Sequence, residues 1–115
     1  MKSKRSKACD FSLAERMAIY ERDRDCIFCK MSYARNSAQG TFFGISHYIP
    51  RSHGGLGIRQ NAVLACQFHH NMMDNGNNGK REEMLQIVKE YLMEHYPDWD
   101  ESQLVYDKWR DIGGG

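Results

Sequence analysis

The residues of this chain that could do chemistry form two sets between positions 26 and 74. The first set consists of thiol and imidazole groups in two pairs, each with two residues between its members. The pairs are Cys26 with Cys29 and Cys66 with His69. Each pair can place two ligands around one ion in a tight turn, and thiolate with imidazole favours Zn²⁺ over hard cations. The spacing therefore predicts one structural Cys₃His zinc site.

The second set is suited to proton transfer and to binding another cation. Its members are Ser46, His47, Asn61, His70 and Asp74. Histidine is the side chain that accepts a proton near neutral pH. In a helix over 67–75, His70 and Asp74 would lie one turn apart on the same side. His69 and His70 would point about 100° apart, so each would face a different metal.

The length of 115 residues predicts a single domain with a modest core, which a structural metal would help to stabilise. The net charge is only +1, but all fifteen acidic residues lie outside 26–73. That segment suits a polyanion, with Arg51 and Arg59 as the candidate phosphate contacts. The alternative interpretation is that the absence of acidic residues from this segment is due to chance in a small protein.

Other features bear on the environment of the protein. Cys9 stands outside the two pairs of candidate zinc ligands, so the cysteines do not form the framework of a secreted disulfide protein. No stretch approaches the roughly 20 apolar residues of a membrane span, and the basic N-terminus is not followed by an apolar run. We expect a cytoplasmic protein that does not enter a membrane.

The expected elements are inferred from capping and periodicity. Residues 1–9 look like a flexible basic tail. Ser12 and Glu15 form a capping box for a helix over 13–24, with Leu13, Met17 and Tyr20 on its apolar face. Two strands, at 41–47 and 61–65, would form a long-looped hairpin.

Helices follow the hairpin. A short helix is expected over 67–75, and a long one over 80–95 has an apolar face made of Met84, Leu85, Val88, Tyr91 and Leu92. Asp100 is a good N-cap for a last helix reaching about Arg110, and 113–115 would be a flexible tail.

The order His47, Asn61, His70 and the sequence around it resemble the HNH endonucleases. Residues 46–55 (SHYIPRSHGG) and 61–70 (NAVLACQFHH) are similar to the family patterns His-x-x-Pro-x-Ser-x-Gly-Gly and Asn-Leu-Val-x-Leu-Cys-x-x-Cys-His. The resemblance covers 23–76 and is strongest to small phage and bacterial members that carry a zinc knuckle.

The resemblance implies an α+β fold with a ββα-metal core, in which a hairpin and a helix grip one catalytic cation and N- and C-terminal helices flank the zinc knuckle. The single nuclease domain would span 10–112, with C-terminal helices over 80–110. His47 would be the general base, Asn61 would hold its loop, and His70 with Asp74 would bind Mg²⁺, Mn²⁺, Ni²⁺ or Zn²⁺.

The implied reaction is hydrolysis of DNA phosphodiester bonds with low sequence specificity, in a bacterial or phage-infected cell. Cutting both strands would call for a homodimer or a larger phage or bacterial nuclease assembly. Ser46 departs from the family, which usually has Asp or His there, and a neutral hydroxyl is a poorer ligand for Mg²⁺ or Mn²⁺. The alternative is a catalytically inactive, zinc-stapled module that binds nucleic acid or protein.

Overall fold

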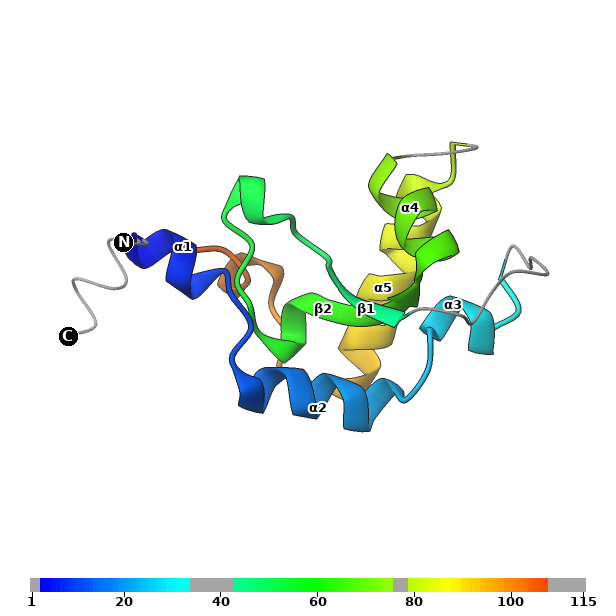
Figure 1. The fold of residues 1–115 in the computed structure, drawn as a ribbon, viewed down its shortest axis with the longest axis horizontal. Helices are drawn as coiled ribbons and strands as arrows, with labels where there is room; N and C mark the ends of the chain where they lie inside the picture. The colour runs from blue at the N-terminus through cyan, green and yellow to red at the C-terminus, as the bar shows by residue number, and fades with distance from the viewer. Residues whose placement is uncertain (1–2, 34–42, 76–78, 108–115) are drawn as a thin grey trace.

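The computed structural model describes residues 3–33, 43–75 and 79–107, which fold into a small α+β domain with a two-stranded antiparallel sheet (Figure 1). The elements in chain order are α1 (Lys4–Ala8), α2 (Leu13–Asp23), α3 (Ile27–Lys30), β1 (Phe43–His47), η1 (Arg51–His53), η2 (Arg59–Asn61), β2 (Ala62–Cys66), α4 (Gln67–Asn75), α5 (Arg81–His95) and η4 (Glu101–Gln103). Within these residues, no helix combines the length and apolar character that crossing a bilayer requires.

Strand β2 is the centre of the domain, because all five of its residues are buried. Successive side chains of a strand point to opposite faces. Ala62 and Leu64 pack with Ile19 of α2 on one face, whereas Val63 and Ala65 join the larger core beneath α5 on the other. β1 pairs with β2 in antiparallel register, with Ile45 opposite Leu64. The predicted hairpin is confirmed.

Helix α5 closes the larger core. Met84, Val88 and Leu92 recur at i, i+4 and i+8, and none of the three is exposed. This spacing places them on one stripe of the helix, as the sequence predicted. The helix packs against α4, so it also sets where α4 lies relative to the sheet.

The Ser12 half of the predicted capping box of α2 is confirmed, but the Glu15 carboxylate bonds Arg59 instead, and the predicted buried face is wrong. The Ser12 hydroxyl accepts a hydrogen bond from the Glu15 amide. Leu13, Met17 and Tyr20 are 73, 53 and 45% exposed, and the buried residues of α2 are Ile19 and Asp23. Apolar spacing alone misleads here, because a network of charged and polar groups binds α2 to the sheet.

Asp23 is the centre of that network. One carboxylate oxygen accepts from the Leu64 amide at 2.8 Å, and the other accepts from the Tyr91 hydroxyl at 2.5 Å. Arg22 donates to both oxygens, at 2.6 and 2.9 Å, and its guanidinium also donates to the carbonyl groups of Arg59 and Ala62. Asp23 therefore ties α2 and α5 to the outer edge of β2.

The expected flexible tail over 1–9 differs from the structure, in which Lys4–Ala8 forms helix α1 capped by the Ser3 hydroxyl. Cys9 is 2% exposed, and the Gly57 amide donates to the Ala8 carbonyl at 2.9 Å. These contacts with the hairpin loop hold the segment, and its basic composition gave no sign of them.

The predicted last helix also differs over its described part. Asp100 caps a single 3₁₀ turn, η4. The chain then pairs with the hairpin loop: the Leu56 amide donates to the Leu104 carbonyl at 2.8 Å, and Val105 bridges Gly55. Backbone bonding to the loop replaces helical bonding there. Residues 108–115, including the expected end of this helix and the 113–115 tail, lie outside the described residues.

Replacing Asp23 by alanine should lower the free energy of unfolding by about 3–5 kcal/mol, because Arg22 would keep a desolvated charge without its partner. Urea unfolding followed by circular dichroism measures the loss. Glu21→Ala, on the exposed side of the same helix, is the control and should change stability by less than about 0.5 kcal/mol. Similar stabilities for the two variants would contradict the central role given to Asp23.

Candidate metal centre and adjoining pocket

Four predicted ligands converge at one point between α3 and the junction of β2 with α4. They are Cys26, Cys29, Cys66 and His69, whose ligand atoms all lie within 4.8 Å of one another. Cys26 caps α3 and Cys29 lies in its only turn, while Cys66 ends β2 and His69 lies in the first turn of α4. This cluster could hold a metal ion.

The spacing of the ligand atoms is compatible with zinc. Nδ1 of His69 lies 3.5, 3.5 and 3.2 Å from the sulfurs of Cys26, Cys29 and Cys66. The sulfurs of Cys29 and Cys66 are 3.6 Å apart. Zn–S bonds of about 2.3 Å and a Zn–N bond of about 2.0 Å in a tetrahedron separate the ligand atoms by roughly 3.5–3.8 Å.

The remaining contacts of His69 select the correct ring nitrogen. Its Nε2 lies 2.7 Å from the Tyr33 carbonyl, which can only accept, so Nε2 carries the proton. Nδ1 therefore directs a lone pair at the three sulfurs. A ligand histidine whose second nitrogen donates to a backbone carbonyl is the usual arrangement in metal sites.

The thiols need a cation to ionise together. Burial, and then the neighbouring sulfurs, raise the pKa of Cys29 to about 12, and burial likewise raises the pKa of Cys26. Thiolates are the metal-binding form, and a divalent ion in their midst would offset both effects.

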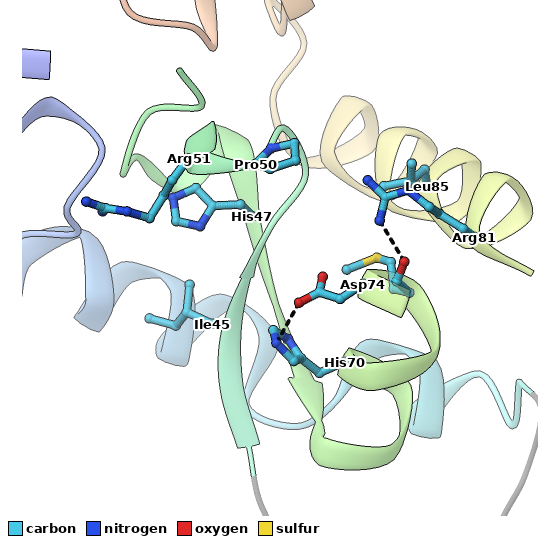
Figure 2. Close-up of a pocket in the computed structure, with 9 residues that line it drawn as sticks. Ile45, His47, Pro50, Arg51, His70, Asp74, Arg81 and Leu85 are labelled. Carbon is cyan, nitrogen blue, oxygen red and sulfur yellow. Dashed lines mark hydrogen bonds and ion pairs between the residues drawn. The ribbon is translucent and has the colours of Figure 1, made fainter. Parts of the chain in front are cut away.

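A second site adjoins the first. A pocket of about 190 Å³ is lined by Ile45, His47, Pro50, Arg51, His70, Met73, Asp74, Arg81 and Leu85. Figure 2 shows His47 and Arg51 on one side of it, His70 and Asp74 below, and Arg81 with Leu85 across from His47. His69 faces the sulfurs and its neighbour His70 faces this pocket, so the two histidines serve different sites.

His47 ends β1 and is held from outside the hairpin. Its Nε2 donates to the Cys9 carbonyl at 3.2 Å, which leaves Nδ1 as the proton acceptor in the neutral ring. The ring of Phe11 packs on it with centroids 4.7 Å apart. Burial is the main cause that lowers the pKa of His47, so the imidazole stays neutral, and able to accept a proton, further into the acid range.

His70 and Asp74 touch each other across one turn of α4. Nε2 of His70 lies 2.9 Å from Oδ2 of Asp74, and Nδ1 of His70 lies 2.5 Å from the Ser46 hydroxyl. Ser46 is 1% exposed. It therefore lies on the ring nitrogen that faces away from Asp74, where it orients His70 instead of joining it as a third ligand of one ion.

Asn61 is fully buried and its side chain holds the hairpin loop. Oδ1 accepts from the Ile49 amide at 2.8 Å, and Nδ2 donates to the carbonyls of Ile49 and Leu56 at 3.1 and 2.9 Å. Gly55 lies in the same loop, where a Cβ would come within 1.7 Å of the Ile49 carbonyl oxygen. Both residues keep the segment after His47 in one path.

The arginines that line the pocket are not the same two that the sequence predicted as phosphate contacts. Arg51 lines the pocket and pairs with Asp10 at 2.5 Å. Arg59 does not line it, because its guanidinium makes bonds of 3.0 and 3.3 Å to Glu15 of α2. Arg81 does line it, with one nitrogen 2.7 Å from the Met73 carbonyl.

Sequence reasoning missed Arg81. Its only local sign is a basic residue in the first turn of a helix, where the helix dipole favours acidic ones.

The structure thus brings His47, His70 and Asp74 to one pocket, places Ser46 and Asn61 behind them, and leaves Arg59 apart. Comparisons with protein-family models, with curated proteins and with solved structures found no significant match.

Purified protein should carry one tightly bound zinc ion per chain, and Cys66→Ser should lose it. We expect the melting temperature to fall by roughly 10 °C or more, because a structural site contributes several kcal/mol and each is worth about 4 °C in a domain of this size. Elemental analysis and a thermal melt measure the two effects. Cys9→Ser is the control and should keep the ion, and equal zinc in both variants would contradict the assignment.

Proposed function

We propose that this protein is an HNH-type endonuclease that hydrolyses DNA phosphodiester bonds with a catalytic divalent cation on a zinc-stapled scaffold. The observation that carries the proposal is that His47, His70, Asp74 and two arginines line one pocket. A proton acceptor, a pair of cation ligands and positive charge are the groups that such a hydrolysis requires. The order β1, β2, α4 also agrees with the ββα core implied by the motifs.

His47 would act as the general base. A water molecule at Nδ1 would give one proton to the ring while its oxygen attacks phosphorus. The bond from phosphorus to the leaving deoxyribose oxygen would break, and that oxygen would take a proton from solvent water. The lowered pKa of His47, caused mainly by burial, keeps the ring neutral for this step. The Cys9 carbonyl and Asn61 support the role, because one orients the ring and the other fixes its loop.

His70 and Asp74 would hold the cation. Their facing atoms are 2.9 Å apart, and two adjacent ligands at about 2.1 Å from an octahedral ion are separated by roughly 3.0 Å. When bound there, the cation supplies charge stabilisation for the phosphorane and for the departing oxygen. The Ser46 hydroxyl can accept from the opposite nitrogen of the His70 ring once Nε2 is used as a ligand.

Arg51 and Arg81 would bind the phosphate groups of the DNA from opposite sides of the pocket. Contacts to phosphate carry no sequence information, so we propose low sequence specificity. Zinc in the Cys₃His cluster would be structural, because all four positions of a tetrahedron are taken by protein ligands.

An inactive binding module is the second candidate, and one observation favours it. With Ser46 turned to Nδ1 of His70, the described residues supply only two ligands, His70 and Asp74, to a catalytic ion. If those two do not retain a cation, the same pocket would bind a phosphate group without hydrolysing it.

Supercoiled plasmid incubated with the protein and Mg²⁺, Mn²⁺ or Ni²⁺ should be nicked, and His47→Ala should slow the reaction by about 100-fold or more, as expected for loss of a general base. Gel electrophoresis of the plasmid over time measures the rate. His53→Ala removes an exposed histidine that does not line the pocket and should retain the activity. Intact plasmid with every metal would favour the binding module.

Ser46→Ala should weaken binding of the catalytic cation by about 10-fold to 100-fold, because the imidazole of His70 loses the group that orients it. The measurement is the metal concentration that gives half-maximal cleavage, together with the zinc content. We expect the zinc content to stay unchanged, because His69 and not His70 faces the sulfurs. An unaltered metal requirement would rule out the orienting role of Ser46.

A further inference from the structure

The N-terminal segment 3–11 reaches the candidate base from outside the motif-bearing region. It contacts the His47 ring through the Cys9 carbonyl and the Phe11 ring. We propose that residues 3–11, here called the N-terminal strap, position His47 for proton abstraction, with Phe11 as a positioning residue. This inference rests on the proposed function and assigns the strap a part in the same site.

The Cys9 carbonyl decides which nitrogen of His47 can act. A carbonyl only accepts, so its 3.2 Å contact requires the proton on Nε2. The free electron pair is then on Nδ1. Without this partner the ring could rotate about its Cβ–Cγ bond or exchange tautomers, and the acceptor would not keep one direction.

Phe11 restricts the ring from its face. The two ring centroids are 4.7 Å apart and the planes are inclined by 47°. Phe11 also packs against the small core formed by Ile19, Ala62 and Leu64, so it is itself held by α2 and β2. The charged side chains near enough to influence the pKa of His47 are Arg51, Asp74 and Asp10.

The strap is anchored to the hairpin loop beyond His47 at several points. The Gly57 amide donates to the Ala8 carbonyl at 2.9 Å, and a Cβ at Gly57 would lie 2.3 Å from the Asp10 carbonyl oxygen. Asp10 pairs with Arg51 at 2.5 Å, and Arg5 donates to the Ser52 carbonyl at 3.2 Å. The loop and the strap therefore hold each other, with His47 between them.

Gly57→Ala and Phe11→Leu test the strap in two ways. Gly57→Ala forces the backbone of Asp10 to move, whereas Phe11→Leu keeps an apolar side chain and removes the ring. Leu13→Ala, at an exposed position just beyond the strap, is the control. Thermal melts establish a temperature at which every variant is folded, and all measurements are made there.

The first measurement does not depend on activity. In protein labelled with ¹⁵N-histidine, the Nε2–H proton of His47 should be visible by NMR in the wild type and in Leu13→Ala, because the Cys9 carbonyl protects it from exchange. In Gly57→Ala this signal should be lost. In Phe11→Leu the carbon-bound protons of the His47 ring should shift, because the aromatic ring beside them is gone.

The second measurement is plasmid cleavage. Both strap variants should lower kcat by about 10-fold to 100-fold, the order of cost expected for a small misplacement of a reacting group. Phe11→Leu, which leaves the Asp10–Arg51 pair in place, should also leave the Kd for DNA unchanged. Unchanged His47 signals in both variants, or a wild-type kcat in both, would overturn the proposal that the strap positions His47. Wild-type protein that cleaves nothing while the His47 signals respond as expected would instead refute the nuclease and leave the strap contact standing.

Discussion

The convergence of three sulfurs and one imidazole nitrogen is the constraint on which the rest of this structure depends. It joins α3, the end of β2 and the first turn of α4 at one point. Because His69 turns its Nδ1 to the sulfurs, the helix is fixed in rotation, and His70 must project about 100° away, toward the pocket. The direction of His69 in the candidate metal cluster thus determines the direction of His70 in the adjoining pocket.

A second layer of contacts fixes the other wall of the pocket. His47 ends a short strand and precedes a long loop, so the strand alone would leave its ring free to move. Asn61 bonds the loop from the side of β2, and the strap covers it from the N-terminus. Arg22 donates to the carbonyls of Arg59 and Ala62, in the segment that contains Asn61, so the buried network around Asp23 also supports this wall. The Cys₃His cluster lies behind one wall, and hydrogen bonds hold the other.

Much of the architecture was predictable because it is locally encoded. The cap at Ser12, the two strands of the hairpin and the stripe of Met84, Val88 and Leu92 each depend on residues close in sequence. The face of α2 was predicted wrongly, because the apolar period of Leu13, Met17 and Tyr20 competes with a charged network whose partners lie on β2 and α5. The strap and the path after η4 were missed for the same reason, since both are held by backbone bonds to a distant loop.

The sequence by itself determined which groups could ligate a metal and which could accept a proton, because both depend on residue type and short spacing. Only the tertiary structure decided how those groups are used. It turned Ser46 to the far nitrogen of His70, paired Arg59 with Glu15, and placed Arg81 opposite His47. Long-range contacts set these outcomes, and a side chain's direction depends on partners that neither its identity nor its spacing specifies.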